Sequence, residues 1–284
     1  MHNIVISGSN SFIGKHLIAK LSGNKKFKLI KMNRSFGDIK YANTWKKLPK
    51  ANILIHLAAK TFVPDSWKNP KEFFDTNIIG TIMALEYCRL NKTKFIFLSS
   101  YLYGNAKYFP TDEKSKLEIK NPYSFTKKTA EDICKFYSKK YKLKVVILRP
   151  SNAYGPGQKL FFLIPDIIKK LKKKKILINN TSIKRDLIYI ADLVDAIEKS
   201  FSIKNKLEIL NIGSGKSYEI IKIISILQKI NRSNLVVKNK GLIKLNEILS
   251  TQLNIKKAKK ILNWEPKYSL TKGLRNTFYN KQIS

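Results

Sequence analysis

The chain has 284 residues, of which 43% are hydrophobic, so it can bury one large core or two interdependent ones and is not a disordered tail. No apolar run approaches the roughly 18 residues that span a bilayer, and the first ten residues lack the features of a secretion signal. The formal net charge of +37 favours anionic partners.

The positive charge is dispersed along the chain, apart from KKLKKKK at 169–175, which we expect to form the solvated end of a helix. Lysine far outnumbers arginine, as a bias towards AT-rich codons would produce. No recognised nucleic-acid module accompanies the charge, so we expect no specific nucleic-acid partner. The positive field should still attract anionic small molecules.

Cysteine content indicates the redox compartment. Cys88 and Cys134 are the only cysteines, too few for a disulfide framework, and both lie in helix-like, apolar surroundings. This pattern predicts a protein of the reduced cytoplasm. We expect no metal site.

The front half alternates apolar runs with amphipathic stretches, which predicts a parallel, doubly wound α/β sheet. The expected strands are Asn3–Ser7, Lys28–Met32, Ile53–Leu57, Lys94–Ser99 and Lys144–Arg149. The expected helices between them include Phe12–Leu21, Glu72–Leu90 and Ser124–Tyr141. Nearly continuous apolarity at 96–98 and 145–148 suits strands that are covered on both faces.

This rhythm breaks after residue 150, where prolines and glycines at 150, 155–157 and 165 indicate long loops. Further helices are expected at 188–200 and 218–230, with another strand at 207–213 and an extended segment at 263–270 before a final helix. We therefore predict a dinucleotide-binding domain of residues 1–155 plus about 186–213. A smaller mixed cap would comprise about 156–185 and 214–284.

Glycines at the first strand–helix junction indicate a phosphate-binding turn. Gly8 and Gly14 would let a pyrophosphate approach backbone N–H groups at a helix N-terminus. Ser11 stands where the usual pattern has its central glycine, which weakens the match.

The end of the second strand indicates which cofactor would bind there. Asn33-Arg34 replaces the acidic residue that accepts the ribose hydroxyls of NAD. Arg34 could clamp a 2′-phosphate, which favours NADP over NAD, or it could be an ordinary surface arginine. Asp38 could accept a hydrogen bond from the adenine amine, or cap a turn.

A tyrosine and a lysine share one face of the helix that begins at Asn-Pro, 121–122. Pro122 suits the first helical position, and the spacing of four places Tyr123 and Lys127 on the same side. An exposed tyrosine that covers a lysine stem would explain this pair equally well, so its meaning depends on the other motifs.

Nine short motifs, in order and at suitable intervals, make the chain resemble the extended short-chain dehydrogenases/reductases, specifically the NAD(P)-dependent epimerase/dehydratase group that acts on nucleotide sugars. The resemblance covers nearly the whole length. It rests on GSNSFIG (8–14), GDI (37–39), HLAA (56–59), DTNIIGT (75–81), LSSYLYG (98–104), YSFTK (123–127), RPSNAYGPG (149–157), RDLIYIADLVDAI (185–197) and NIGSG (211–215). It implies a Rossmann sheet with a C-terminal substrate-binding cap.

The resemblance assigns catalytic roles to three residues. Tyr123 would be the general acid/base, and Lys127 would favour its phenolate and hold the nicotinamide ribose. Ser99, four residues before Tyr103, would donate a hydrogen bond to the substrate oxygen, with Ser100 as the competing candidate. Moving a phenol from a pKa near 10 to ~7 takes roughly 4 kcal/mol.

The resemblance also implies the residues that bind the cofactor and the substrate. Asn77 would fix the active-site helix, or simply cap a helix. The cofactor residues would be Gly8, Ser11, Phe12, Ile13, Gly14, Asn33, Arg34, Asp38, Ile39, Leu57, Ala58, Ala59 and Asn77, with Tyr123 and Lys127. The substrate, a nucleotide-diphosphate sugar, would be held by Ser99, Ser100, Asn152 and Arg185. Arg185 could instead form a salt bridge with Asp186.

Within this family, the sequence leaves two possible reactions. The family's dehydratases carry an Asp-Glu pair after the active-site hydroxyl residue, which the sequence after Ser99 lacks. Epimerases that invert C3 and C5 need an extra acid such as histidine, and the histidines lie in the front half, at positions 2, 16 and 56. A 4-epimerase and a 4-keto reductase remain, both transferring hydride at a sugar carbon.

Two other classes of function stay open. A protein of this fold could bind a dinucleotide without turnover, although the intact Ser99, Tyr123 and Lys127 argue against that role. A basic polyanion-binding protein would show steep salt dependence. The resemblance also implies a homodimer formed through the helices at 72–90 and 124–141.

Overall fold

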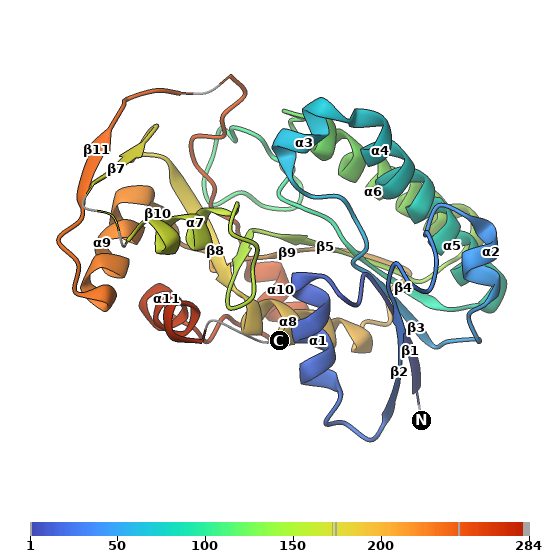
Figure 1. Cartoon of the computed structure of the whole chain (residues 1–284). Coiled ribbons are helices and arrows are strands. Elements are labelled where there is room, and N and C mark those ends of the chain that lie inside the picture. The colour runs from blue at the N-terminus through green and yellow to red at the C-terminus, as the bar shows by residue number, and fades with distance from the viewer. Residues whose placement is uncertain (1, 172, 174, 244, 281–284) are drawn as a thin grey trace.

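A computed structural model describes residues 2–171, 173, 175–243 and 245–280. Its centre is a six-stranded, all-parallel sheet with the strand order β2-β1-β3-β4-β5-β9. Figure 1 shows helices covering both faces of this sheet. The strands are β1 (His2–Ser7), β2 (Phe27–Met32), β3 (Ile53–His56), β4 (Lys94–Leu98), β5 (Val145–Pro150) and β9 (Leu207–Ile212).

The predicted doubly wound α/β architecture is confirmed, and the reason lies in the central strands. Every residue of β3, β4 and β5 is buried, as expected for strands with helices on both sides. One core lies beneath α1 (Phe12–Leu21) and α8 (Ile190–Lys199) and continues into the cap. The other lies beneath α2 (Ala42–Lys46), α5 (Gly80–Asn91) and α6 (Pro122–Tyr141).

The rest of the chain builds smaller units at one end of the sheet (Figure 1). A three-stranded sheet has the order β10-β8-β6, and a two-stranded sheet pairs β11 with β7. These strands are β6 (Asn152–Tyr154), β7 (Lys175–Ile178), β8 (Lys184–Tyr189), β10 (Ser217–Glu219) and β11 (Val236–Asn239). The helices are α7 (Leu163–Lys170), α9 (Ile220–Asn231), α10 (Lys256–Leu262) and α11 (Leu270–Tyr279), with a 3-10 turn, η2, at Ser200–Ser202.

The short strands β6 and β8 bear on the proposed domain boundaries. Both belong to the three-stranded sheet, yet β6 precedes residue 155 and β8 crosses from 185 to 186. The small sheet therefore draws on both segments of the predicted division, which stays a prediction.

Two local expectations differ from the structure. The helix expected at 72–90 is three consecutive elements, α4 (Pro70–Phe74), a π-helical turn η1 (Asp75–Ile79) and α5, preceded by α3 (Val63–Lys68). The basic run 169–175 is a helix end only in part, because Lys169 and Lys170 form the last turn of α7 and β7 begins at Lys175. Residues 172 and 174 of that run lie outside the described residues.

A buried lysine ties the main sheet to the end of α8. The Lys94 ammonium donates to three backbone carbonyls, those of Ser200 and Phe201 at 2.9 Å and that of Ile203 at 2.7 Å. Burial lowers the pKa of Lys94 to about 8. We expect Lys94→Met to lower the free energy of unfolding by about 2–3 kcal/mol, because it leaves buried carbonyls without a donor.

Chemical denaturation of the unmodified protein and of Lys94→Met measures this effect. The exposed Lys140 of α6 provides the control, since Lys140→Met should change the free energy of unfolding by less than about 0.5 kcal/mol. Equal free energies of unfolding for the two variants would show that the hydrogen bonds of Lys94 do not stabilise the fold.

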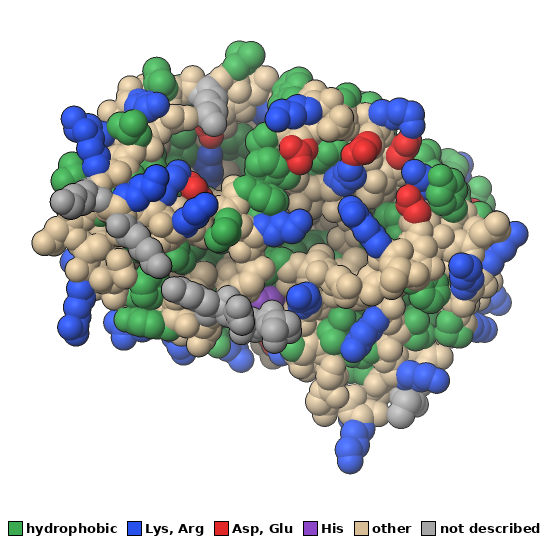
Figure 2. Space-filling model, in the orientation of Figure 1, with side chains coloured by type: hydrophobic (Ala, Val, Ile, Leu, Met, Phe, Trp, Pro, Cys, Tyr) green, Lys and Arg blue, Asp and Glu red, His purple; other side chains and the backbone are tan. Residues whose placement is uncertain are grey.

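The surface is basic without a single basic patch on the face seen in Figure 2, where Lys and Arg side chains spread over the whole view. Both cysteines are free and buried. Among the described residues we find no helix with the length and apolarity needed to cross a membrane.

Candidate active site

The N-terminus of α6 holds the two residues that the sequence singled out. Asn121 caps the helix, its side-chain oxygen accepting from the Ser124 backbone N–H at 2.8 Å while the Asn121 N–H donates to the Ser124 hydroxyl at 3.1 Å. Pro122 occupies the first helical position. This reciprocal cap fixes the first turn, and with it the direction of Tyr123 and Lys127.

Tyr123 is partly buried, and its phenol meets the side chain of Ser100. Burial raises the pKa of Tyr123 above its ordinary value, and a hydrogen-bonding interaction with Ser100 partly opposes the rise. The protein groups around it thus favour the neutral phenol. The lowered pKa predicted for Tyr123 depended also on a bound oxidised nicotinamide and stays a prediction.

Ser99 lies in a different environment from the one predicted for it. Its hydroxyl donates to the Glu131 carboxylate at 2.5 Å, and only 4% of the residue is exposed. Counting back four residues from Tyr103 selects Ser99, whereas the structure brings Ser100 to Tyr123. The hydroxyl available to a substrate beside Tyr123 is therefore that of Ser100, the competing candidate.

Lys127 is buried one helical turn after Tyr123. Its ammonium donates to the Leu98 carbonyl oxygen at 2.5 Å and lies 4.2 Å from the centre of the Phe97 ring. Burial lowers the pKa of Lys127 to about 8, with Cys134 and Glu131 acting in the opposite direction. The lysine is thus anchored to the end of β4, next to the serine pair.

Asn77 holds α6 against the loop that follows β3. Its side-chain oxygen accepts from the Lys60 N–H at 2.8 Å, and its amide donates to the Lys60 carbonyl at 3.0 Å and to the Thr126 hydroxyl at 2.9 Å. Thr126 is the residue before Lys127, so these contacts join the loop to the active-site helix. Asn77 itself lies in the π-helical turn η1.

The β1–α1 turn has the shape of a phosphate cradle. Gly8 has φ +76°, and a Cβ there would lie 2.7 Å from the Ala58 nitrogen, while one at Gly14 would lie 2.4 Å from the Gly8 oxygen. The Ser11 hydroxyl accepts from the Gly14 N–H at 3.0 Å and caps α1. Ser11 therefore caps the helix at the position where the usual pattern has glycine.

A dinucleotide fits this turn on the protein's own geometry. The Ser9 hydroxyl is buried and has no hydrogen-bond partner in the structure, although buried polar groups normally have one. The backbone is closely packed only because both glycines lack side chains. An unpaired hydroxyl beside a helix N-terminus suits an anionic phosphate.

Most of the other predicted cofactor residues lie next to this turn, whereas Ile39 lies at α5. Phe12 and Ile13 open α1, and Leu57, Ala58 and Ala59 follow β3, where the Leu57 N–H donates to the Ser7 carbonyl at 3.1 Å. The Ile39 side chain packs against Gly80 of α5.

Two polar residues after β2 organise local turns. The Asn33 side-chain oxygen accepts from the backbone N–H and hydroxyl of Ser35, at 3.0 and 2.6 Å. Asp38 accepts from the Lys40 N–H at 3.1 Å, the turn cap that was the alternative for this residue. Arg34 between them is exposed.

The predicted diphosphate residues lie in the small sheet. Asn152 is exposed on β6, opposite Leu187 of β8. The Arg185 guanidinium pairs with Glu247 at 3.0 Å and donates to the Ile248 carbonyl at 2.7 Å, so it does not pair with Asp186. A phosphate role for Arg185 would have to share the guanidinium with Glu247.

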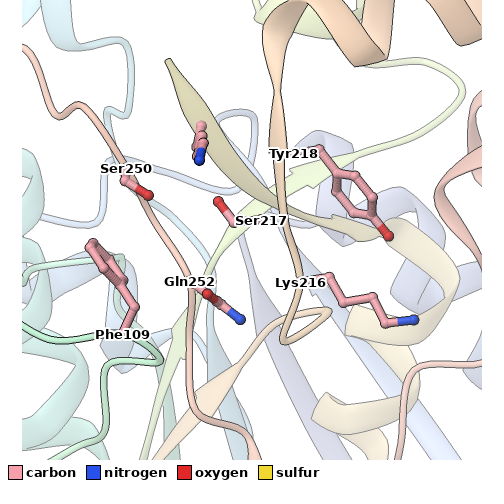
Figure 3. Close-up of a pocket in the computed structure, with 7 residues that line it drawn as sticks. Phe109, Lys216, Ser217, Tyr218, Ser250 and Gln252 are labelled. Atoms are coloured by element: carbon pink, nitrogen blue, oxygen red, sulfur yellow. The ribbon is translucent and has the colours of Figure 1, made fainter. Parts of the chain in front are cut away.

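A pocket of about 530 Å³ opens beside Arg185, bounded by β8, β10 and two loops. Figure 3 shows Phe109 and Tyr218 at its two ends, with Ser217 and Gln252 between them. Lys184 of β8 lines the pocket, whereas Arg185 is not among its lining residues.

A buried polar network that was not predicted from the sequence lies behind the site. Arg149 of β5 contacts the Glu131 carboxylate through two nitrogens, the shorter contact being 2.6 Å. Arg149 also donates to the Tyr103 hydroxyl at 2.9 Å, which donates to the Asn211 side-chain oxygen at 2.6 Å. The spacing of Tyr123, Lys127 and Glu131 by four residues was the available signal.

Comparison with known proteins decides the family. A family model described as "NAD dependent epimerase/dehydratase family" matches residues 4–213. The chain belongs to this family. Sequence relatives match this chain over nearly its whole length. The putative UDP-glucose 4-epimerase of Methanocaldococcus jannaschii is 30% identical, over 96% of each chain.

Two further relatives show the range of activities among similar proteins. The GDP-6-deoxy-D-mannose reductase of Pseudomonas aeruginosa is 25% identical, over 96% of this chain and 94% of that protein. The solved UDP-glucuronic acid 4-epimerase of Bacillus cereus, in complex with UDP-glucuronic acid and NAD, is 27% identical with a TM-score of 0.90, over 98% of both chains. The protein is thus an NAD(P)-dependent enzyme of the nucleotide-sugar epimerase/dehydratase family.

Proposed function

We propose that the protein transfers hydride at C4 of a nucleotide-diphosphate sugar, with Tyr123 as general acid/base. The observation that carries this proposal is the meeting of Tyr123, Ser100 and Lys127 at the carboxyl end of β4. That edge of a doubly wound sheet is where ligands bind. The bound nicotinamide supplies the hydride chemistry.

The protein's residues divide the remaining work. Tyr123 gives a proton to, or takes one from, the sugar C4 oxygen. Ser100 donates a hydrogen bond to the same oxygen as its charge changes. Lys127 contributes positive charge and, with Asn77 behind it, fixes the helix that carries Tyr123.

Cofactor binding is assigned to the β1–α1 turn. Gly8, Ser9 and Gly14 would hold the pyrophosphate, because the two glycines allow close approach and the Ser9 hydroxyl has no partner in the protein. On the substrate side, Asn152 and Arg185 would hold the diphosphate of the nucleotide sugar.

Epimerisation at C4 is the first candidate reaction, since the relatives that cover nearly all of the chain include 4-epimerases. Reduction of a 4-keto sugar is the second, and a specific observation favours it. Arg34 stands in place of an acidic residue and suits the 2′-phosphate of NADPH.

One experiment separates these reactions. Purified protein is incubated with UDP-glucose, UDP-glucuronic acid or GDP-6-deoxy-D-mannose and either NAD⁺ or NADP⁺, while nicotinamide absorbance and sugar configuration are followed. A 4-epimer formed without net change in the cofactor means epimerase. Stoichiometric reduction of the added cofactor by GDP-6-deoxy-D-mannose means the reverse of a 4-keto reduction. No reaction in any combination would reject the proposal.

Cofactor preference is tested at Arg34. We expect NADPH to bind more tightly than NADH and Arg34→Ala to weaken NADPH binding about tenfold while leaving NADH binding unchanged, because only the 2′-phosphate needs the guanidinium. Calorimetry measures both affinities. Arg89 of α5, which pairs with Glu86, provides the control arginine. Tighter binding of NADH by the unmodified protein would reject this role of Arg34.

A further inference from the structure

We propose that Ser99 is a positioning residue, which donates its hydroxyl to Glu131 and thereby fixes the strand end that presents Ser100 to Tyr123. This inference rests on the function proposed above and deepens it, since it explains how the two neighbouring serines divide their roles.

Ser99 is bound from both sides at the end of the main sheet. Its backbone N–H donates to the Leu148 carbonyl at 2.8 Å, which continues the pairing of β4 with β5. Its hydroxyl donates to Glu131 at 2.5 Å. A hydroxyl has one proton to donate, so Ser99 cannot make this bond and also donate to a substrate oxygen.

Three residues of α6, spaced by one turn, act on three consecutive residues at the end of β4. Tyr123 meets Ser100, the Lys127 ammonium binds the Leu98 carbonyl, and Glu131 binds Ser99. The two residues directly before Ser100 are both bound by α6, the helix that carries Tyr123. The direction of the Ser100 side chain is therefore set relative to the Tyr123 phenol.

Glu131 is a rigid acceptor for Ser99. It is fully buried, and the Arg149 guanidinium holds both of its oxygens, with the shortest contact at 2.6 Å. Arg149 is itself fixed by the Tyr103 hydroxyl at 2.9 Å. A buried charge pair of this kind is costly to rearrange, so the position of Glu131 is transmitted to Ser99.

The informative change is Ser99→Ala, because it removes the bond to Glu131 and leaves the Glu131–Arg149 pair intact. We expect kcat to fall about tenfold, since a small misplacement of a reacting group is enough to cost that much. The KM for the nucleotide sugar and the affinity for NADP(H) should stay within about twofold, because neither ligand contacts Ser99 in this assignment.

A double-mutant cycle distinguishes positioning from general loss of structure. Ser100→Ala alone should lower kcat about 100-fold. If Ser99 acts only through Ser100, the double variant should match Ser100→Ala, because no hydroxyl remains to be positioned. Independent effects would multiply to a loss of about 1,000-fold, and that result would overturn the proposal.

The substrate for these assays is whichever of UDP-glucose, UDP-glucuronic acid and GDP-6-deoxy-D-mannose the unmodified protein converts fastest. Ser138→Ala is the matched control, since Ser138 is a buried serine near the other end of α6 whose hydroxyl binds the Lys206 carbonyl at 3.0 Å. It should leave kcat unchanged. An equal loss of kcat in Ser138→Ala and Ser99→Ala would overturn the proposal.

Failure of this inference can be told from failure of the proposed function. Normal turnover of the unmodified protein with an unchanged rate in Ser99→Ala overturns the positioning role alone. Absence of turnover with all three sugars overturns the proposed function and the positioning role with it.

Discussion

Tyr123→Phe should fold normally and bind NADP(H) normally, yet lose kcat roughly 10³-fold, because it removes the proton donor and acceptor at C4. The phenyl ring keeps the packing of Tyr123 in the first turn of α6. That turn is held by Asn121 and Ser124 rather than by the phenol, so the cap stays intact. The loss should appear in kcat and in kcat/KM equally, as expected for an interaction made in the transition state.

Tyr101→Phe is the matched control for this prediction. Tyr101 is a buried tyrosine directly after Ser100, but its hydroxyl donates to the Gly104 carbonyl at 3.2 Å rather than facing Tyr123. Turnover in Tyr101→Phe should change by less than about tenfold. Near-normal turnover in Tyr123→Phe would remove this phenol from the mechanism and assign proton transfer at C4 to another group.

The sheet was readable from sequence because its strands are buried on both faces. Apolar runs such as 96–98 and 145–148 have no polar face, so the pattern is unambiguous, and the strands were expected within a residue or two of their observed ends. Strands β6, β8 and β10 were missed. They are only three to six residues long and carry charged or polar residues such as Lys184 and Glu219, so neither length nor alternation marks them.

The active-site helix was also predictable, because cap, proline, tyrosine and lysine lie within seven residues. The identity of the facing serine was not. Spacing from Tyr103 favours Ser99, but Tyr103 is drawn into the core by Arg149 and Asn211. Its distance along the chain therefore does not report which serine faces Tyr123. The partner of Arg185 was hidden in the same way, since Glu247 lies 62 residues later.

Lys127→Met should lower kcat/KM about 100-fold, because it removes a buried positive charge one helical turn from Tyr123 while it preserves the length of the side chain. The unmodified protein should show why this charge matters. Burial lowers the pKa of Lys127 to about 8, so its ammonium is present below that pH and is lost above it. The rate constant kcat/KM of the unmodified protein should therefore fall about tenfold per pH unit above pH 8.

The contribution of Lys127 to the free energy of unfolding changes with pH in the opposite direction to kcat/KM. Because the folded state releases the Lys127 proton near pH 8 while the unfolded chain keeps it to about 10.4, the folded state binds fewer protons in that window and this lysine makes folding more favourable as pH rises. A loss of activity above pH 8 with stability maintained therefore identifies loss of a functional charge, not unfolding. His56, packed near Lys127, has its pKa lowered to about 3 by burial and stays neutral throughout the window. An alkaline limb that persists unchanged in Lys127→Met would assign the titration to another group and reject Lys127 as its source.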